Sequence, residues 1–366
     1  MTDKVVGWVL DDMMTVAIRA VIAVFCLYAI VILLVLILRL VNLYRKYKQK
    51  LVILELTPPV FSDKTPLATN QLFSVLHGLL KTRSLGQLFL RYTPSFSMEL
   101  TSSRSSGIRC LIYANADYEE IIRQTVTAYN PDVKVRCVKA DDKSIKGFVS
   151  FGRYRQTGHF AMPIDTSTSI NDHDPVSYLA NSMTKLKDDE KVTLQLVITP
   201  AIVAQAAGID RKIRMGYWSG SSLEKWNSTK GLVKILFIII KLPFVLVFGM
   251  IYAFITNDIY RSERNPTYNH PSAKPPAEQE LLDQMHSKLN QDLFYVSIRS
   301  EVIAETKKSC KERNKSVANS LMTFANSSRQ TLRQTGGWLP WLGQRARRVA
   351  FTKRLPTYFH SSSNIL

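Results

Sequence analysis

The chain has 366 residues, with 48 Lys and Arg against 29 Asp and Glu, so its formal net charge is +19. Hydrophobic residues make up 46% and charged residues 21%, values typical of a chain with packed cores and not of a disordered one. The four cysteines form no CxxC pair, which excludes a zinc ribbon, a thioredoxin-type site and a small disulfide-stapled fold. The excess of positive charge favours an acidic partner, either anionic lipid or nucleic acid.

The clearest feature is an apolar segment near the start, Ala20–Leu38, which is 19 residues long and contains no charge, Pro or Gly. At about 1.5 Å per residue it spans roughly 28 Å, close to the thickness of a bilayer core. A cleavable signal peptide has a shorter apolar region and a basic start, whereas this segment follows Asp3, Asp11 and Asp12. A buried core helix rarely runs this long without a polar face. We therefore expect a retained transmembrane helix within residues 1–50.

The flanks of this segment predict its orientation. Residues 39–50 carry five basic residues and no acid, namely Arg39, Arg45, Lys46, Lys48 and Lys50. Because basic flanks stay in the cytoplasm, the N-terminus is expected outside and the main domains inside. The prediction is a single-pass anchor in the inner (cell) membrane, with the lipid bilayer as a partner.

A second hydrophobic segment, 229–257, is interrupted by Lys241 and Pro243. It is either a second span, with the Lys241 ammonium reaching the interface, or a hairpin of two short arms that dips into the membrane. We favour the hairpin. A true span would place residues 256–366 outside.

Residues 51–228 are expected to form an α/β domain. Apolar periodicity predicts helices over 70–81 and 118–129 and strands over 51–56, 87–92, 96–100, 108–114, 133–138, 147–151 and 192–198. The order of these elements predicts an α+β fold, with ferredoxin-like units that contain a mixed or antiparallel sheet.

Three further segments follow. Residues 258–279 are expected to be a Pro-rich linker. Residues 280–335 are expected to be a smaller α/β unit, with helices over 280–289 and 315–324 and a strand over 293–298. Residues 336–366 form a basic, aromatic tail in which five basic residues gather, namely Arg345, Arg347, Arg348, Lys353 and Arg354.

The basic tail and the basic flank of the anchor are the candidate binding residues. Basic side chains neutralise phosphates, and neighbouring aromatic rings such as Trp338 and Trp341 can stack on bases. The same mixture suits an anionic bilayer surface. A solvated basic face without a ligand is the third interpretation, and the sequence leaves all three open.

No catalytic motif is visible. The sequence contains no GxxxxGK[ST], GxGxxG, HExxH or GxSxG pattern, and its six histidines have no metal-ligand spacing. We therefore expect no cofactor, no metal site and no enzymatic activity. The alternative is a membrane-bound, metal-dependent transferase that uses Asp172 and Asp174 to hold Mg²⁺ or Mn²⁺.

The cysteines carry one structural prediction and one use. Cys110 and Cys137 fall between apolar residues of expected strands, so both are expected to be buried. Cys310 follows the second hydrophobic segment, and its labelling by an impermeant thiol reagent would report the side on which the C-terminal part lies.

The stretch LELTPPVFSDKTPLATNQLFSVLHGL at Leu54–Leu79 is similar to an uncharacterised bacterial domain that directly follows an N-terminal membrane anchor. The resemblance continues through Met98–Arg109 and Ala128–Pro131 and covers roughly residues 15–366. In longer family members this domain precedes a conjugative coupling-type ATPase of type IV secretion. The family domain has no assigned activity, so no catalytic residue carries over.

The resemblance implies a non-catalytic assembly portion of a conjugation or type IV secretion coupling apparatus. Because the phosphate-binding loop is missing, the chain is expected to be either a truncated or split product whose ATPase lies on another polypeptide, or a stand-alone relative of the family. Self-association and contact with nucleic acid are further expectations, and a generic membrane scaffold that binds anionic lipid or nucleic acid is the alternative.

Overall fold

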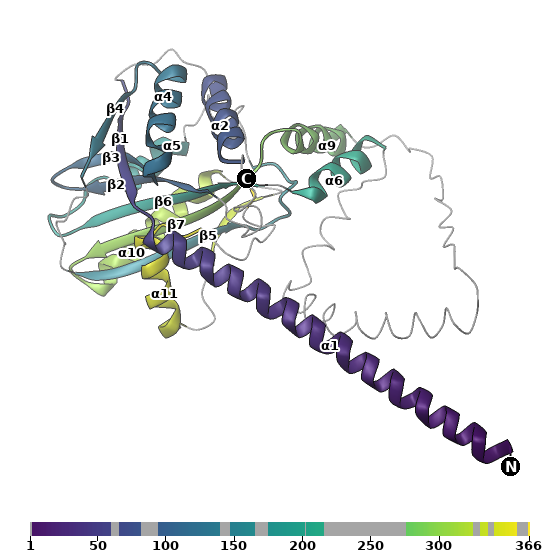
Figure 1. Cartoon of the computed structure of the whole chain (residues 1–366). Helices are drawn as coiled ribbons and strands as arrows, with labels where there is room; N and C mark the ends of the chain where they lie inside the picture. Colours follow the sequence, from purple (N-terminus) through teal and green to yellow (C-terminus); the bar gives the residue numbers. More distant parts are fainter. Residues whose placement is uncertain are drawn as a thin grey trace. The chain divides into compact units, whose positions relative to one another are not determined.

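The computed structural model of the chain describes residues 2–59, 66–81, 94–139, 147–164, 175–201, 203–215, 276–324, 330–335, 340–356 and 365–366 (Figure 1). The chain divides into two compact units. The first contains the N-terminal 42 residues, and the second contains residues 43–224 and 274–366. Each unit is described by itself.

Helix α1, Thr2–Lys48, contains the segment that the sequence predicts as an anchor. Its section Phe25–Lys48 is the one helix among the described residues that is long and apolar enough to cross a membrane. Its 24 residues span about 36 Å at 1.5 Å per residue. Large apolar side chains along it are exposed, including Leu27 at 64% and Ile30 at 62%. Length, composition and exposure are therefore consistent with a membrane anchor.

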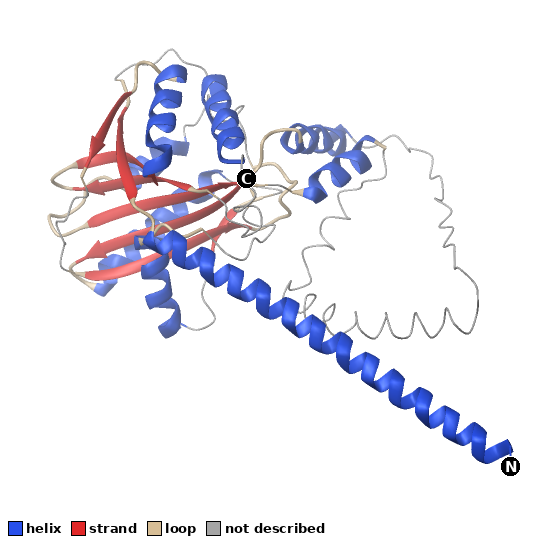
Figure 2. Cartoon of the chain, viewed as in Figure 1, coloured by secondary structure: helices blue, strands red, loops and turns tan. Residues whose placement is uncertain are grey.

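The second unit is built on one sheet of eight described strands, in the order β4-β1-β3-β2-β6-β7-β5-β8 (Figure 2). All neighbouring strands are antiparallel, so the predicted α+β class is confirmed and the sheet is antiparallel. The strands are β1 Leu51–Thr57, β2 Phe96–Ser103, β3 Gly107–Asn115, β4 Lys134–Val138, β5 Phe148–Gln156, β6 Lys191–Pro200, β7 Phe294–Ala304 and β8 Leu332–Gln334.

Two copies of one topology make up this sheet. The first copy runs β1-α2-β2-β3-α4-β4 along the chain and orders its strands β4-β1-β3-β2. The second copy runs β5-α5-β6-β7-α10-β8, with an insertion between β6 and β7, and orders its strands β8-β5-β7-β6. Both have the ferredoxin-like arrangement, and they join where β2 pairs with β6. The crossover helices are α2 Pro66–Lys81, α4 Glu119–Tyr129, α5 Pro175–Ser182 and α10 Lys307–Leu321.

The second copy corrects the predicted domain boundaries. Residues 280–335 were expected to be a separate unit, but strand β7 lies between β6 and β5 in the common sheet. The sequence separates β7 from β6 by 93 residues, 201–293, whereas three residues connect β2 to β3. Local patterns cannot reveal a pairing across such a distance, because hydrogen bonds between strands leave no local periodicity.

The insertion between β6 and β7 has its own small core. Helix α6, Ala204–Arg214, packs with helix α9, Pro276–Leu289. Their buried side chains form a second hydrophobic cluster, which includes Ile209, Ile213, Leu282 and Met285. The predicted hydrophobic segment 229–257 lies outside the described residues. The expected linker 258–279 ends earlier than predicted, because α9 begins at Pro276, where proline's fixed φ suits the first turn of a helix.

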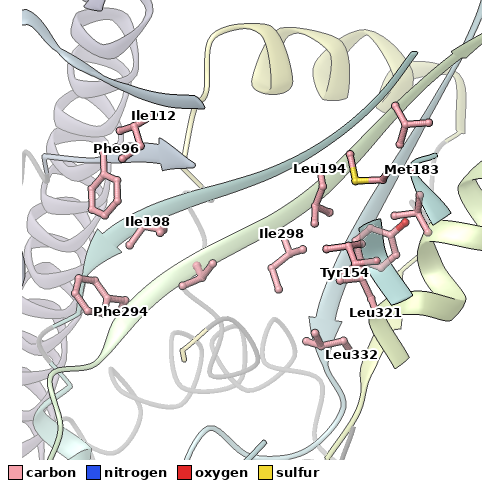
Figure 3. Close-up of a cluster of buried hydrophobic side chains, with 14 of the residues drawn as sticks. Phe96, Ile112, Tyr154, Met183, Leu194, Ile198, Phe294, Ile298, Leu321 and Leu332 are labelled. Atoms are coloured by element: carbon pink, nitrogen blue, oxygen red, sulfur yellow. The ribbon is translucent and has the colours of Figure 1, made fainter. Parts of the chain in front are cut away.

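One hydrophobic core lies between the sheet and the four crossover helices. Alternate residues of β6 contribute to it, among them Val192, Leu194 and Ile198, which confirms the predicted strand at 192–198. Figure 3 shows part of this core, with Phe96, Ile198 and Phe294 at one end and Tyr154, Leu321 and Leu332 at the other.

The opposite face of the sheet carries helix α11, Pro340–Thr352, which lies on the other side of the strands from α2 and α4 (Figure 1). The Phe351 ring of α11 is 5.7 Å from the Phe151 ring of β5, centroid to centroid. Phe151 is out of phase with the core residue Tyr154, so it points to this face. Helix α11, which the sequence placed in the basic tail, is therefore a packed part of the body.

Most predicted elements are present and several are longer than expected. Strand β5 was predicted to end at Phe151 but continues to Gln156, and β7 was predicted to end at Ile298 but continues to Ala304. The expected strand at 87–92 lies outside the described residues. Helices α5 and α6 and strand β8 were not predicted, because each is short or polar.

The cysteine predictions were partly wrong. Cys137 is exposed on the edge strand β4, and Cys110 is half-buried. Cys310 is buried, with 2% of its surface exposed, and its thiol donates a hydrogen bond to the Phe148 carbonyl at 2.8 Å. Cys310 is therefore a poor reporter for an impermeant reagent, and Cys137 is the better choice.

A polar network inside the second copy fixes the contact between α10 and the sheet. The Tyr154 hydroxyl lies 2.9 Å from the Ser300 hydroxyl and 3.2 Å from Asn314 Oδ1. Ser300 also donates to Asn314 Oδ1 at 2.7 Å. Gly152 lies against this network, and a Cβ there would be 2.6 Å from the Tyr154 hydroxyl and 2.8 Å from Asn314 Oδ1. The site has no room for a methyl group.

Replacement of Gly152 by Ala should therefore destabilise the protein by about 1–3 kcal/mol, the usual cost of overpacking a buried site. The measurement is the free energy of unfolding of the full chain in detergent. Gly208→Ala is the matched control, since a Cβ on Gly208 meets nothing within 4 Å and alanine favours a helix. Equal stability of the Gly152→Ala variant and the native chain would contradict the described packing.

Candidate membrane-proximal basic surface

The two basic segments that the sequence singles out meet at the end of α1. The Lys353 ammonium, just after α11, lies 4.4 Å from the centroid of the Tyr47 ring. This is a cation–π contact between residues that are about 300 positions apart. The exposed basic residues beside it on the chain are Arg45, Lys48 and Lys50. We call these three residues and Lys353 the juxtamembrane basic surface.

Arg299 of β7 holds α11 in place. Its guanidinium donates to the carbonyls of Ala350 at 2.8 Å and Leu355 at 2.5 Å. Gln195 of β6 donates to the Phe351 carbonyl at 3.0 Å. The last carbonyls of a helix lack partners within the helix and carry partial negative charge. A cationic side chain from the sheet therefore satisfies the end of α11 and positions Lys353.

Arg354 was predicted to contact lipid or nucleic acid, and the structure corrects this prediction. Its guanidinium donates to Glu99 at 2.8 Å and lies 3.4 Å from the centroid of the Tyr113 ring. Glu99 is buried and also accepts a hydrogen bond from Gln195 at 2.9 Å. Arg354 therefore links the turn after α11 to strand β2, and its guanidinium forms an internal ion pair with Glu99.

The other predicted residues fall into three groups. Lys46 is buried, with 7% of its surface exposed, so it is not a surface contact as predicted. Arg348 is exposed on α11 and Arg347 is half-buried. The side chains of Arg39 and Arg345 lie outside the described part of the structure.

A cleft of about 380 Å³ opens on the sheet beside the end of α11. Charged residues of both signs line it, including Glu99, Arg354, Arg109 and Glu301. Arg109 donates to Glu55 at 2.6 Å, and this hydrogen bond lowers the pKa of the Glu55 carboxyl. Burial raises the pKa of Glu301. Arg109 is paired with Glu55, and Arg354 is paired with Glu99. These ion pairs suit a polar surface with a structural role.

The described residues contain no group of three or more His, Cys, Asp or Glu side chains that could hold a metal ion. Asp172 and Asp174, the alternative metal ligands, lie outside the described residues. The transferase alternative therefore stays a prediction that this structure does not address.

A set of arginines on the same sheet face as α11 was not predicted from the sequence. They are Arg153 and Arg155 of β5, Arg299 of β7 and Arg333 of β8. The signal was present as alternate arginines in the segment FGRYRQ, because alternate residues of a strand share a face. It was missed because the predicted strand ended at Phe151.

A scan against models of known protein families finds no match for this chain. A search of curated proteins finds no match either.

Arg354 forms an internal ion pair, whereas Arg348 is exposed on α11. Substitution of each residue can test this difference. Arg354→Ala should lower the free energy of unfolding by about 2–4 kcal/mol, because it leaves the buried Glu99 carboxylate without its ion-pair partner. Arg348→Ala, on an exposed side chain, should change it by less than about 0.5 kcal/mol. Chemical denaturation of both full-length variants in detergent measures the difference. Two equal losses would show that Arg354 does not have the internal role described.

Proposed function

We propose that the protein is the membrane-anchored, non-catalytic assembly portion of a conjugation or type IV secretion coupling apparatus. The observation that carries the proposal is an exposed apolar helix, α1, whose chain continues directly into a body with two ferredoxin-like copies. The resemblance at Leu54–Leu79 is what points to a secretion or conjugation apparatus in particular. These 366 residues contain no phosphate-binding loop, so the proposal places nucleotide hydrolysis outside them.

The proposed topology places the N-terminus outside and the body in the cytoplasm of the inner membrane. The basic residues after the apolar section support this orientation, and Lys353 adds a further positive charge to the same surface. The juxtamembrane basic surface then faces anionic headgroups, where each basic residue contributes roughly 1 kcal/mol. Nucleic acid on this surface is the competing expectation.

Thiol labelling tests the topology. In a variant that keeps Cys137 alone, an impermeant thiol reagent should leave the protein unlabelled in intact cells and label it after the membrane is permeabilised, because Cys137 is exposed on β4. The protein should also stay in the membrane fraction after alkaline extraction. Labelling in intact cells would indicate the opposite orientation. Release of the protein by alkali would contradict a membrane-spanning anchor.

Affinity purification tests the apparatus. The tagged full chain, purified from native membranes in mild detergent, should bring down an ATPase of a secretion or conjugation system, identified by mass spectrometry. The control is a chain that ends after Lys50, which keeps the anchor but lacks the sheet. An ATPase recovered equally with both chains, or with neither, would contradict assembly through the folded body.

A further inference from the structure

Strand β5 is paired along only part of its outer side. It lies beyond β7 in the sheet (Figure 1), and on its other side β8 pairs with Tyr154–Gln156. The first residues of β5, Phe148–Gly152, pair with β7 and, within the described structure, with no strand on the outer side. We call Phe148–Gly152 the free edge of β5.

The backbone of the free edge has donors and acceptors that point outward. The Thr335 N–H donates to the Arg153 carbonyl at 2.8 Å, so this carbonyl points to the side of β5 on which β8 lies. In an antiparallel ladder every second residue directs its N–H and C=O to the same side, and Val149 and Phe151 therefore point outward too. On that side neither residue has a backbone partner in the described structure. Unpaired groups of this kind are a template for an added strand.

The side chains of the free edge lack the usual protection against such pairing. Sheets commonly protect an edge with charged residues or proline. The opposite edge of this sheet, β4, carries Lys134 and Arg136, both exposed. The free edge contains no charged residue and no proline, and 55% of Phe148 and 38% of Val149 are exposed. This edge is therefore open to another chain in a way that β4 is not.

A row of lysines on α10 runs alongside the free edge. The Cys310 thiol donates to the Phe148 carbonyl at 2.8 Å, and Asn314 Nδ2 donates to the Ser150 hydroxyl at 3.2 Å. Four residues of a helix rise about 6 Å and two residues of a strand about 6.6 Å, so α10 keeps step with alternate residues of β5. Each of these two α10 residues has an exposed lysine one position after it and three positions before it, and these lysines are Lys307, Lys311 and Lys315.

The lysine row lies on the flank of α10 that is nearer the free edge. Arg313 is two residues from both Lys311 and Lys315, which at about 100° per residue puts it on the other flank of the helix. Its guanidinium donates to Glu190, just before β6, at 2.9 Å. Because β6 and β5 lie on opposite sides of β7, the Arg313 flank faces the middle of the sheet and the lysine row faces its border. Within the described structure the lysines of the row form no ion pair.

We propose that the free edge of β5 binds an extended, acidic segment of a partner protein, which adds a strand to the sheet. Backbone hydrogen bonds to Val149 and Phe151 hold the added strand, as in other cases of strand addition. Its acidic side chains occupy alternate positions and face the lysine row, and the positions between them are apolar and lie on the face of Val149. The inference goes beyond the proposed function, because it names the docking edge and the chemistry of the partner.

A second copy of this chain fits the free edge less well. Antiparallel pairing of two such edges would bring both α10 helices to the same face of the enlarged sheet, so that the two lysine rows would face each other. Like charges that lie opposite each other destabilise such a pairing. An acidic segment instead supplies the negative charge that complements the row.

The test measures the binding of a fluorescein-labelled peptide to the full chain in detergent by fluorescence anisotropy. The probe alternates glutamate and valine over about seven residues, which at roughly 3.3 Å per residue is long enough to span the free edge. A control peptide alternates lysine and valine, and another carries a central proline, which cannot complete a ladder. The glutamate peptide should bind about tenfold more tightly than either control, and its affinity should fall as salt is added.

Matched variants of the chain complete the test. Val149→Pro removes an outward N–H but leaves the pairing with β7, so it should weaken binding by about tenfold, whereas Val149→Thr keeps this N–H and should bind as the native chain does. Lys311→Glu combined with Lys315→Glu should invert the preference, so that the lysine peptide binds more tightly. Lys134→Glu combined with Arg136→Glu, on β4, should change neither affinity. The unfolding transition verifies that each variant is folded, and if Val149→Pro is not, the inverted preference still decides.

The following outcomes would overturn the inference. No binding of the glutamate peptide, or equal binding of its proline form, would exclude strand addition. A loss of binding in the β4 variant but not in the α10 variant would place the peptide at the other edge. Dimers of the native chain in sedimentation equilibrium that Val149→Pro dissociates would identify a second copy as the occupant. Each of these results leaves the proposed function in place, because that function fails on alkaline extraction and affinity purification instead.

Discussion

The pairing of β2 with β6 is the constraint on which the rest of the body depends. In each ferredoxin-like copy this strand would otherwise be an edge, with unpaired backbone groups open to another chain. The ladder runs from Phe96 opposite Ile198 to Ser103 opposite Lys191 and turns two four-stranded sheets into one. Because the two strands are antiparallel, the copies are related by an approximate two-fold rotation. All four crossover helices then share one face and one core, and the other face is left for α11.

The free face shows why the polar residues of the body fall into two classes. Glu99, Gln195, Arg299 and Arg354 form hydrogen bonds that fix α11 and the turn after it. Arg45, Lys48 and Lys50 are exposed at the end of α1 and just after it, and Lys353 packs on the Tyr47 ring. The net charge of +19 therefore includes charges used for folding and charges that remain available to a partner. Composition alone cannot separate them.

The sequence predicts local elements of this fold well and its long-range features poorly. The apolar run that became α1, the periodicity of α2 and α4 and the strand at 192–198 are visible because each repeats its pattern over several residues. The common sheet is not visible, because β6 and β7 pair across 93 intervening residues and β8 has only three residues.

The same limit applied to the candidate site. Arg45, Lys48, Lys50 and Lys353 were found from charge clustering; the first three are exposed and Lys353 is half-buried. Arg354 was found in the same way but is internal, because the left-handed turn that directs it toward Glu99, with φ of 51°, has no sequence signature in a non-glycine residue. Arg153 and Arg155 were missed because the end of β5 was placed five residues early. Periodicity identified the strand, but tertiary pairing decided where it stopped.

The position of the insertion has a consequence for how the chain tolerates change. It leaves the sheet after β6 and returns at the start of β7, two neighbours in the sheet, and α6 packs against α9 at its base. The cost of closing a loop grows only slowly with its length. Residues beyond this helix pair can thus be lengthened, shortened or exchanged without disturbing the strand order. The strand order of the sheet therefore sets no limit on the length of chain between α6 and α9.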